Sequence, residues 1–198
     1  GKTIATKLAE PEHYKDYYKD IATFAIPIKE NIINSQQLMP KVTTSDNSDA
    51  SFLADPKKDE NFKFAEKGWI QYEFEKPFNC KSIVVETKGR DFQAQRLIVE
   101  VSNDGVHFKF HERMIAPRHG WQDMDVHHTH TIKPVTAKYF RFVYDAKGTE
   151  PGAEDLDFAK WKQNLKVSKI TLSNQSLIDN FEGKSGAVWR LSPTTTAE

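Results

Sequence analysis

Histidines cluster at one point of the chain in a pattern that could bind a metal ion. His127, His128 and His130 occur in the sequence His-His-Thr-His, and on a strand His128 and His130 would share one face about 7 Å apart. Two imidazoles at that spacing can act as metal ligands, with Asp125 or His119 as a third. The alternative is an exposed polar strand face, which we prefer because no cysteine and no His-x-x-x-His pattern accompanies them.

An oxygen-rich loop is a second candidate for metal binding. Asp46, Asn47 and Asp49 lie close together, and their side chains are the ligand type that Ca²⁺ prefers. The spacing of an EF-hand is absent. A structural Ca²⁺ and a solvated connection are therefore the two alternatives, and we expect the solvated connection. The sequence indicates no other cofactor.

These residues must be positioned by strands, because alternating and β-branched patterns dominate the chain. The strongest patterns lie between Gly68 and Phe108. Three successive strands separated by turns are predicted there: 70–74, with apolar residues at every second position, 82–87, and 97–101. Asn103-Asp104-Gly105 then supplies turn residues, and Val106–Phe110 is predicted as the hairpin partner.

Further strands are predicted before and after this block. One spans Ile21–Ile26 and ends at Pro27, another spans Lys138–Tyr144, and a late one spans Leu165–Leu172. Many short strands separated by turns are typical of an antiparallel β-sandwich or jelly roll. The single cysteine, Cys80, is expected to be a small buried hydrophobic residue next to a strand.

Length and charge exclude several classes of protein. A chain of 198 residues is expected to form one domain. Lys plus Arg and Asp plus Glu both number 28, so the chain lacks the positive charge of a nucleic-acid-binding protein. No run of about 18 apolar residues is present, so we expect no membrane span.

The order of several motifs resembles the discoidin, or coagulation factor 5/8 type C, domain family of the galactose-binding-like jelly rolls. The motifs are Trp69–Phe74 with Lys76-Pro77-Phe78, Ser82–Glu86, Val99–Phe108, Ala137–Phe142 and Val167–Leu172. Phe108 stands where the family has tryptophan, and the usual cysteine pair is absent. The resemblance implies an all-β, antiparallel, galactose-binding-like sandwich, with an irregular N-terminal segment.

A narrower resemblance concerns both ends of the chain. Tyr18–Pro27 and Asn180–Gly186 are similar to segments of bacterial α-L-rhamnosidases of glycoside hydrolase family 106. This resemblance implies a fragment of a periplasmic or secreted glycan-degrading enzyme, with a neighbouring catalytic domain as its partner. We divide the chain into an N-terminal segment (1–35) carried over from or packing on that neighbour, a sandwich (36–190) and a tail or linker (191–198).

Sugar binding requires a flat aromatic ring for the C–H face of the sugar and polar groups for its hydroxyls. In jelly rolls that this chain resembles, such groups come from loops at one end of the barrel. The candidates here are Trp121, Arg118, His119, Arg90, Asp91 and Trp161. Trp121 could instead fold back as a lid on the core, and Arg90 with Asp91 could be a surface ion pair.

These observations predict a non-catalytic carbohydrate-binding or accessory module that binds a glycan or oligosaccharide. No set of nucleophile, base and orienting residue is visible, so we do not expect this chain to be an enzyme. The alternative is a purely structural spacer that packs on the catalytic barrel and binds no sugar. An apolar face that is exposed in the fragment would favour the spacer.

Overall fold

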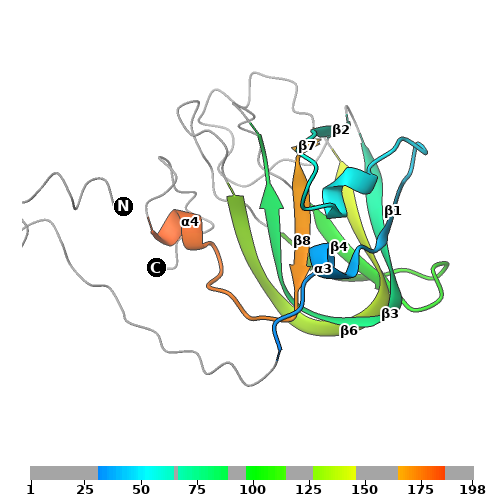
Figure 1. The fold of residues 1–198 in the computed structure, drawn as a ribbon. Coiled ribbons are helices and arrows are strands. Elements are labelled where there is room, and N and C mark those ends of the chain that lie inside the picture. The colour runs from blue at the N-terminus through cyan, green and yellow to red at the C-terminus, as the bar shows by residue number, and fades with distance from the viewer. Residues whose placement is uncertain (1–30, 65–66, 89–96, 115–126, 146–164, 186–198) are drawn as a thin grey trace, which may run out of the picture.

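The structure is a computed structural model that describes residues 31–64, 67–88, 97–114, 127–145 and 165–185 (Figure 1). Strands dominate it, which confirms the all-β prediction. The strands are β1 (Lys41–Thr44), β2 (Phe62–Phe64), β3 (Lys67–Glu86), β4 (Ile98–Ser102), β5 (Lys109–Arg113), β6 (His127–Asp145), β7 (Leu165–Val167) and β8 (Lys169–Ser173). Short helical turns are α3 (Ser35–Leu38), the 3₁₀ turn η1 (Ser51–Ala54) and α4 (Phe181–Lys184).

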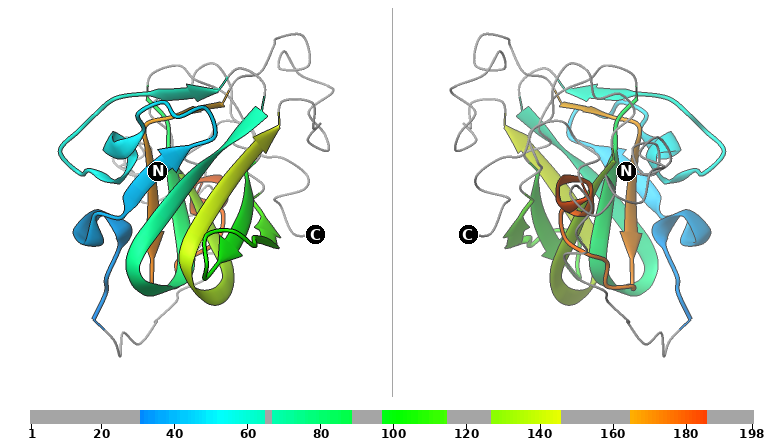
Figure 2. Two further views of the ribbon diagram at one scale, coloured as in Figure 1. Left: turned by 90° about the vertical axis from the view of Figure 1, so that its right-hand side faces the viewer. Right: turned by 90° about the vertical axis from the view of Figure 1, so that its left-hand side faces the viewer.

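Two long strands, β3 with 20 residues and β6 with 19, form both layers of the sandwich. They pair antiparallel along their length, and both bend so that each forms a U (Figure 2). In one layer, the first arm of β3 and the last arm of β6 lie side by side, and the strand order is β1-β3-β6-β4-β5. In the other layer, the second arm of β3 pairs with β8. A separate two-stranded ladder joins β2 to β7.

The bend of β3 corrects the prediction of two strands separated by a turn. Pairing with β6 is interrupted between Glu73 and Phe78 and again between Cys80 and Ser82, but the strand continues through both irregularities. Pro77 lies in the first interruption, and Pro134 of β6 lies opposite the second. Proline donates no ladder hydrogen bond and is tolerated in a sheet at bulges. Pro77 therefore lies at a bend within one continuous strand and does not mark a turn between two strands.

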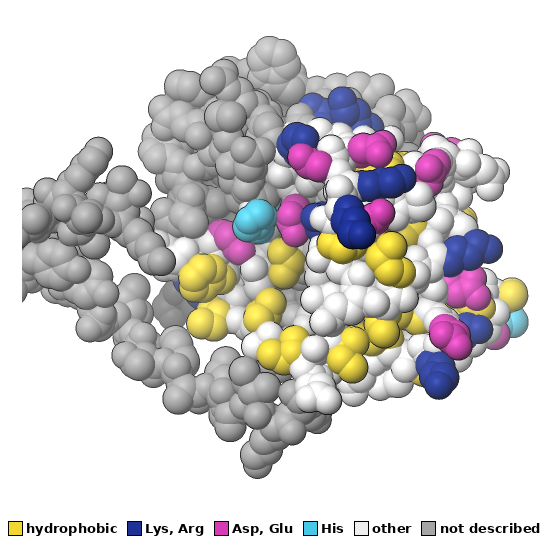
Figure 3. Space-filling view, in the orientation of Figure 1, with side chains coloured by type: hydrophobic (Ala, Val, Ile, Leu, Met, Phe, Trp, Pro, Cys, Tyr) yellow, Lys and Arg dark blue, Asp and Glu magenta, His cyan; other side chains and the backbone are white. Residues whose placement is uncertain are grey.

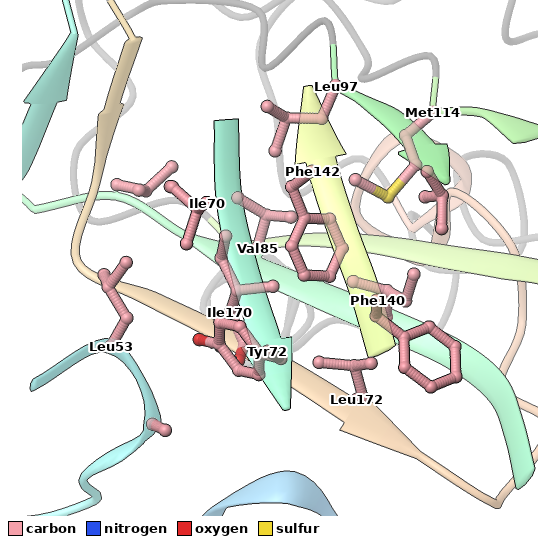
Figure 4. Close-up of a cluster of buried hydrophobic side chains, with 14 of the residues drawn as sticks. Leu53, Ile70, Tyr72, Val85, Leu97, Met114, Phe140, Phe142, Ile170 and Leu172 are labelled. Atoms are coloured by element: carbon pink, nitrogen blue, oxygen red, sulfur yellow. The ribbon is translucent and has the colours of Figure 1, made fainter. Parts of the chain in front are cut away.

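The core lies between the two layers and is rich in aromatic rings (Figure 4). The predicted alternation is confirmed in β3, where Ile70, Tyr72 and Phe74 are buried. Tyr72 and Phe142 meet edge to face with ring centroids 5.6 Å apart. The Tyr72 hydroxyl donates to the backbone carbonyl of Ile170 in the other layer at 3.0 Å, so its polar end is satisfied inside the core.

Other core residues also match the sequence pattern. Cys80 is buried as predicted, and burial raises the pKa of its thiol to about 12. Burial also raises the pKa of Tyr72 well above its ordinary value. In the predicted strands 97–101 and 138–144, alternate side chains are buried: Leu97, Val99, Phe140, Phe142 and Tyr144. The late strand is divided at Ser168, whose N–H donates to the carbonyl of Glu86 at 2.8 Å.

The hairpin after β4 is present, although β5 begins at Lys109 and not at Val106. Gly105 has a φ of 76°, and a Cβ there would lie 3.0 Å from the Tyr139 ring. The Asp104 carboxylate accepts the N–H groups of Val106 and His107 at 2.8 Å. Hydrogen bonds, chiefly from the side chain of His107, hold the pKa of Asp104 well below its ordinary value.

Among the described residues, no strand pairs with β6 on its outer edge at residues 129–133, and side chains from other segments cover that edge. The Glu182 carboxylate accepts the N–H of Thr129 at 2.9 Å and its hydroxyl at 2.6 Å. Asp179 accepts the N–H of Thr131 at 3.0 Å. On the β5 side, Glu112 accepts the N–H of residue 133 at 3.0 Å. Alternate N–H groups of this edge are therefore paired with carboxylates, which protects an edge that would otherwise offer itself to another strand.

Replacing Glu182 with alanine tests this edge. The change leaves the Thr129 N–H buried without its acceptor, so we expect the free energy of unfolding to fall by about 1–3 kcal/mol. Chemical denaturation followed by tryptophan fluorescence measures the loss. The matched control is Glu75→Ala on the exposed part of β3, which should change stability little. Equal losses in the two variants would contradict the assigned role of Glu182.

Candidate functional site

The end of the sandwich opposite the bends of β3 and β6 is the candidate site. Because each long strand forms a U, both of its ends reach this end of the molecule (Figures 1 and 2). The register shows the same arrangement, since Glu86 pairs with His127 and Lys67 pairs with Asp145. The segments 89–96, 115–126 and 146–164 therefore all leave and re-enter the sandwich at this end.

All six predicted sugar-binding residues fall within these three segments. Arg90 and Asp91 belong to the first, Arg118, His119 and Trp121 to the second, and Trp161 to the third. They lie outside the described residues, so their side-chain positions and contacts stay a prediction. What the described strands establish is that the three segments carrying them start and finish at the same end of the fold.

The described residues that flank these segments include buried apolar side chains and one exposed ion pair. Leu97 and Met114 are buried at the bases of two segments, and the Met114 N–H donates to the Leu97 carbonyl at 2.9 Å (Figure 4). The Lys88 ammonium pairs with the Asp59 carboxylate. Packing of Leu97 and Met114 in the core fixes the described ends of these two segments.

A second cluster lies on the outer face of β3 and β6, and sequence analysis did not select it as a site. The Arg141 guanidinium lies 4.4 Å from the centroid of the Trp69 ring and 3.5 Å from that of Phe108. It also donates to the Gln71 side chain at 2.9 Å. Desolvation lowers the pKa of Arg141, and the charge of Glu100 opposes that shift.

This cluster is explained best as a structural clamp. Phe108 precedes β5, so its stacking on Arg141 holds the hairpin against the sheet. The guanidinium covers ring surface that a ligand would otherwise use. The signal in the sequence was the alternation that places Trp69 on β3 and Arg141 on β6 on the same outward face, but their proximity depends on the register between the two strands.

The histidine cluster corrects one of our interpretations. His128 and His130 are buried, so the preferred reading of an exposed polar strand face is wrong for them. The reason is the register with β3, which pairs His128 with Val85 and His130 with Ile83 of the core, so both histidines lie on the face of β6 that points into the sandwich. Burial lowers the pKa of His130 to about 4, and the charge of Asp179 opposes the shift. Such a histidine is neutral at pH 7.

The metal-binding hypotheses find no arrangement of ligands in the part of the chain that the structure describes. There, no group of three or more His, Cys, Asp or Glu side chains is placed to hold a metal ion. In the oxygen-rich loop, Asp46 accepts from the Thr44 hydroxyl at 2.9 Å and from the Ser48 N–H at 3.0 Å, and these bonds lower its pKa. Asp49 accepts the Ser51 N–H at 2.9 Å. Both carboxylates thus stabilise turns.

The bent antiparallel sheet and its aromatic core define a galactose-binding-like β-sandwich. Sequence comparison then gives the family, because the F5/8 type C domain matches residues 34–154. The chain belongs to the F5/8 type C, or discoidin, domain family. Domains of this family are generally non-catalytic. A comparison with curated protein sequences gives no match.

Solved structures with the same fold include carbohydrate-binding modules. CpGH89CBM32-5 from Clostridium perfringens, in complex with GalNAc-β-1,3-galactose, is 13% identical with a TM-score of 0.50, over 71% of this chain and 99% of that chain. CBM32-3 from a family 31 glycoside hydrolase of C. perfringens is 11% identical with a TM-score of 0.52, over 73% and 95%. These low identities show a shared fold alone.

A rhamnosidase from Novosphingobium sp. PP1Y is also similar, at 17% identity and a TM-score of 0.49, over 74% of this chain and 12% of that chain. In the described part of the chain, no helix is long and apolar enough to cross a membrane.

The buried His130 makes the stability of the sandwich depend on pH. Its pKa is about 6.5 when unfolded and about 4 when folded, so its full contribution is present above pH 6.5 and is lost as the pH falls towards 4. The total loss should be about 3 kcal/mol. Urea unfolding at pH 7.5, 6, 5 and 4 measures it. The slope should flatten in His130→Gln and persist in His127→Gln, the exposed neighbour. An unchanged slope in His130→Gln would contradict this origin.

Proposed function

We propose that this domain is a non-catalytic carbohydrate-binding module that uses the end of the sandwich carrying residues 89–96, 115–126 and 146–164. The observation that carries the proposal is the convergence of these three segments in a member of the F5/8 type C family. Together they hold two tryptophans, two arginines, a histidine and an aspartate among the selected residues. This combination suits a sugar, whose C–H face binds aromatic rings and whose hydroxyls bind polar side chains.

The mechanism is binding without chemistry. Trp121 supplies the ring that covers the sugar face, and Arg118 and His119 beside it supply donors for the hydroxyls. Arg90 and Asp91 extend the polar set from a second segment, and Trp161 belongs to the third. A module of this kind raises the concentration of an attached enzyme at its glycan through avidity. Two modules with the same fold support this context: one is in complex with GalNAc-β-1,3-galactose, and the other comes from a family 31 glycoside hydrolase.

For the parent protein we propose a bacterial, α-L-rhamnosidase-like glycoside hydrolase that is periplasmic or secreted. Its catalytic domain would be the neighbour of this module, with the sandwich at 36–190, a preceding segment at 1–35 and a linker at 191–198. The support is the resemblance of Tyr18–Pro27 and Asn180–Gly186 to such enzymes. The balanced charge of the chain, 28 basic and 28 acidic residues, fits a neutral glycan better than a nucleic acid.

One observation favours the alternative function, a spacer that packs on a catalytic barrel and binds no sugar. Four large apolar side chains near α3 are exposed: Ile32, Ile33, Leu38 and Met39. An exposed apolar surface of this kind is expected where a domain packs on a neighbour. The two functions separate by direct measurement of glycan binding.

Trp121→Ala is the decisive variant for sugar binding. Loss of the stacking ring should weaken the affinity at least about tenfold, which corresponds to about 1.4 kcal/mol. A glycan array identifies the ligand, and calorimetry then compares the variants. Phe110→Ala is the matched control, because Phe110 is also an exposed aromatic residue but lies on β5.

The control should bind as the parent domain does. Unchanged affinity in Trp121→Ala would contradict the assigned platform, and the absence of binding to any arrayed glycan would favour the spacer.

A further inference from the structure

An apolar surface near the start of the described chain has no role in the site discussed above. We call it the α3 face and define it by Ile32, Ile33, Leu38 and Met39, whose exposed fractions are 41%, 38%, 48% and 53%. Hydrophobic side chains form a band across this side of the molecule, below most of its charged residues (Figure 3). Exposed apolar residues scattered singly are common, but these four flank one short helix, two before its N-cap and two at its C-terminal end, and we take them together as a candidate binding surface.

The α3 face is built on a rigid base. Asn34 and Gln37 form a reciprocal capping box, with bonds of 2.9 and 3.1 Å. The Ser35 hydroxyl accepts the Leu172 N–H of β8 at 3.0 Å, which pins the helix to the sheet. Met39 ends the helix with a φ of 47°, a left-handed conformation that is uncommon for a residue with a side chain. The apolar side chains are therefore held outwards by a fixed backbone.

The chain reaches this face directly from its N-terminal residues. The Ile33 N–H donates to the Asn174 side chain at 2.9 Å, and the Asn174 N–H donates to the Ile33 carbonyl at 3.1 Å. These bonds fix the point at which residue 31 leads to the preceding thirty residues. Among those, residues 21–28 read Ile-Ala-Thr-Phe-Ala-Ile-Pro-Ile and contain no charge. Only Lys29, Glu30 and Asn31 separate this apolar stretch from Ile32.

We propose that the occupant of the α3 face is this chain's own segment 21–28. Extended chain spans about 3.3 Å per residue, so the eight residues reach about 26 Å and can cross the face after a turn at 29–31. A tether of three residues keeps the segment at a high effective concentration beside the patch, which a separate partner does not have. The match is also chemical, because an uncharged apolar segment meets a surface formed by apolar side chains. The inference is independent of sugar binding.

Paramagnetic relaxation measured by NMR on the full 198-residue chain tests the contact. Cys80 is buried, so a spin label can be directed to a new cysteine at Leu38, on the α3 face. We expect strong broadening of the amide signals of residues 21–28. The matched control carries the label at Val106, which is 75% exposed in the hairpin beside β5, at the other edge of the sheet from β1 and α3 (Figure 2). That label should leave these signals sharp.

The competing occupants give different outcomes. A mixture of isotope-labelled protein without spin label and spin-labelled protein without isotope reports contact between molecules. Broadening in this mixture would overturn the proposal in favour of a second copy. Absence of broadening in both samples would overturn it in favour of a separate domain, and would strengthen the spacer function. In Phe24→Asp, the broadening from the Leu38 label should disappear while the β-sandwich signals are retained, and its persistence would also overturn the proposal.

Discussion

The pairing of β3 with β6 is the constraint on which the rest of the structure depends. These strands pair with each other on both sides of their bends, so one continuous two-stranded ribbon supplies the centre of both layers. A sheet that turned sharply without interruptions would strain its ladder. Here the register shifts remove ladder bonds at the bend. Pro77 lies in the first shift and Pro134 lies opposite the second, where neither is required to donate an N–H.

The bent ribbon also decides where variable segments can lie. Because both strands are folded back on themselves, their four ends meet at one end of the sandwich. The segments that join β3 to β4, β5 to β6 and β6 to β7 therefore begin or finish there. The edges of the ribbon are closed in different ways: β1 and β8 pair with β3, β4 pairs with one arm of β6, and the other arm is covered by Glu182, Asp179 and Glu112. The edges of the bent ribbon are thus closed by strands and side chains that all belong to the described part of the chain.

The sequence predicted what depends on local periodicity and missed what depends on distant partners. Alternation in 70–74 and 138–144 identifies buried faces because it reflects the pleat of the strand itself. The unbroken course of β3 through Pro77 depends on β6, which begins about forty residues after β3 ends, so turn chemistry suggested two strands. Burial of His128 and His130 depends on their pairing with Val85 and Ile83 of β3, more than forty positions earlier, and their polar residue type gave no sign of a core-facing position.

The candidate site shows the same division. Residue chemistry selected Trp121 and its neighbours, and the family resemblance implied loops at one end of the barrel. The bend of β3 and β6 is the physical cause that brings the ends of these segments together, and no local pattern indicates it. The Arg141 clamp was likewise invisible, since Trp69 and Phe108 meet the guanidinium only through the register of three strands.

The clamp also accounts for one departure from the family pattern. Stacking on a guanidinium needs a flat ring of sufficient area, not an indole nitrogen, and Phe108 supplies that ring where the family has tryptophan. Trp69 provides a second ring at 4.4 Å, so the smaller side chain does not leave Arg141 without aromatic contact. The usual cysteine pair is absent as well, and here hydrogen bonds join the two ends of the described sandwich. Ile33 and Asn174, 141 positions apart, are tied by a side-chain and a backbone bond, so the fold is closed without a covalent link.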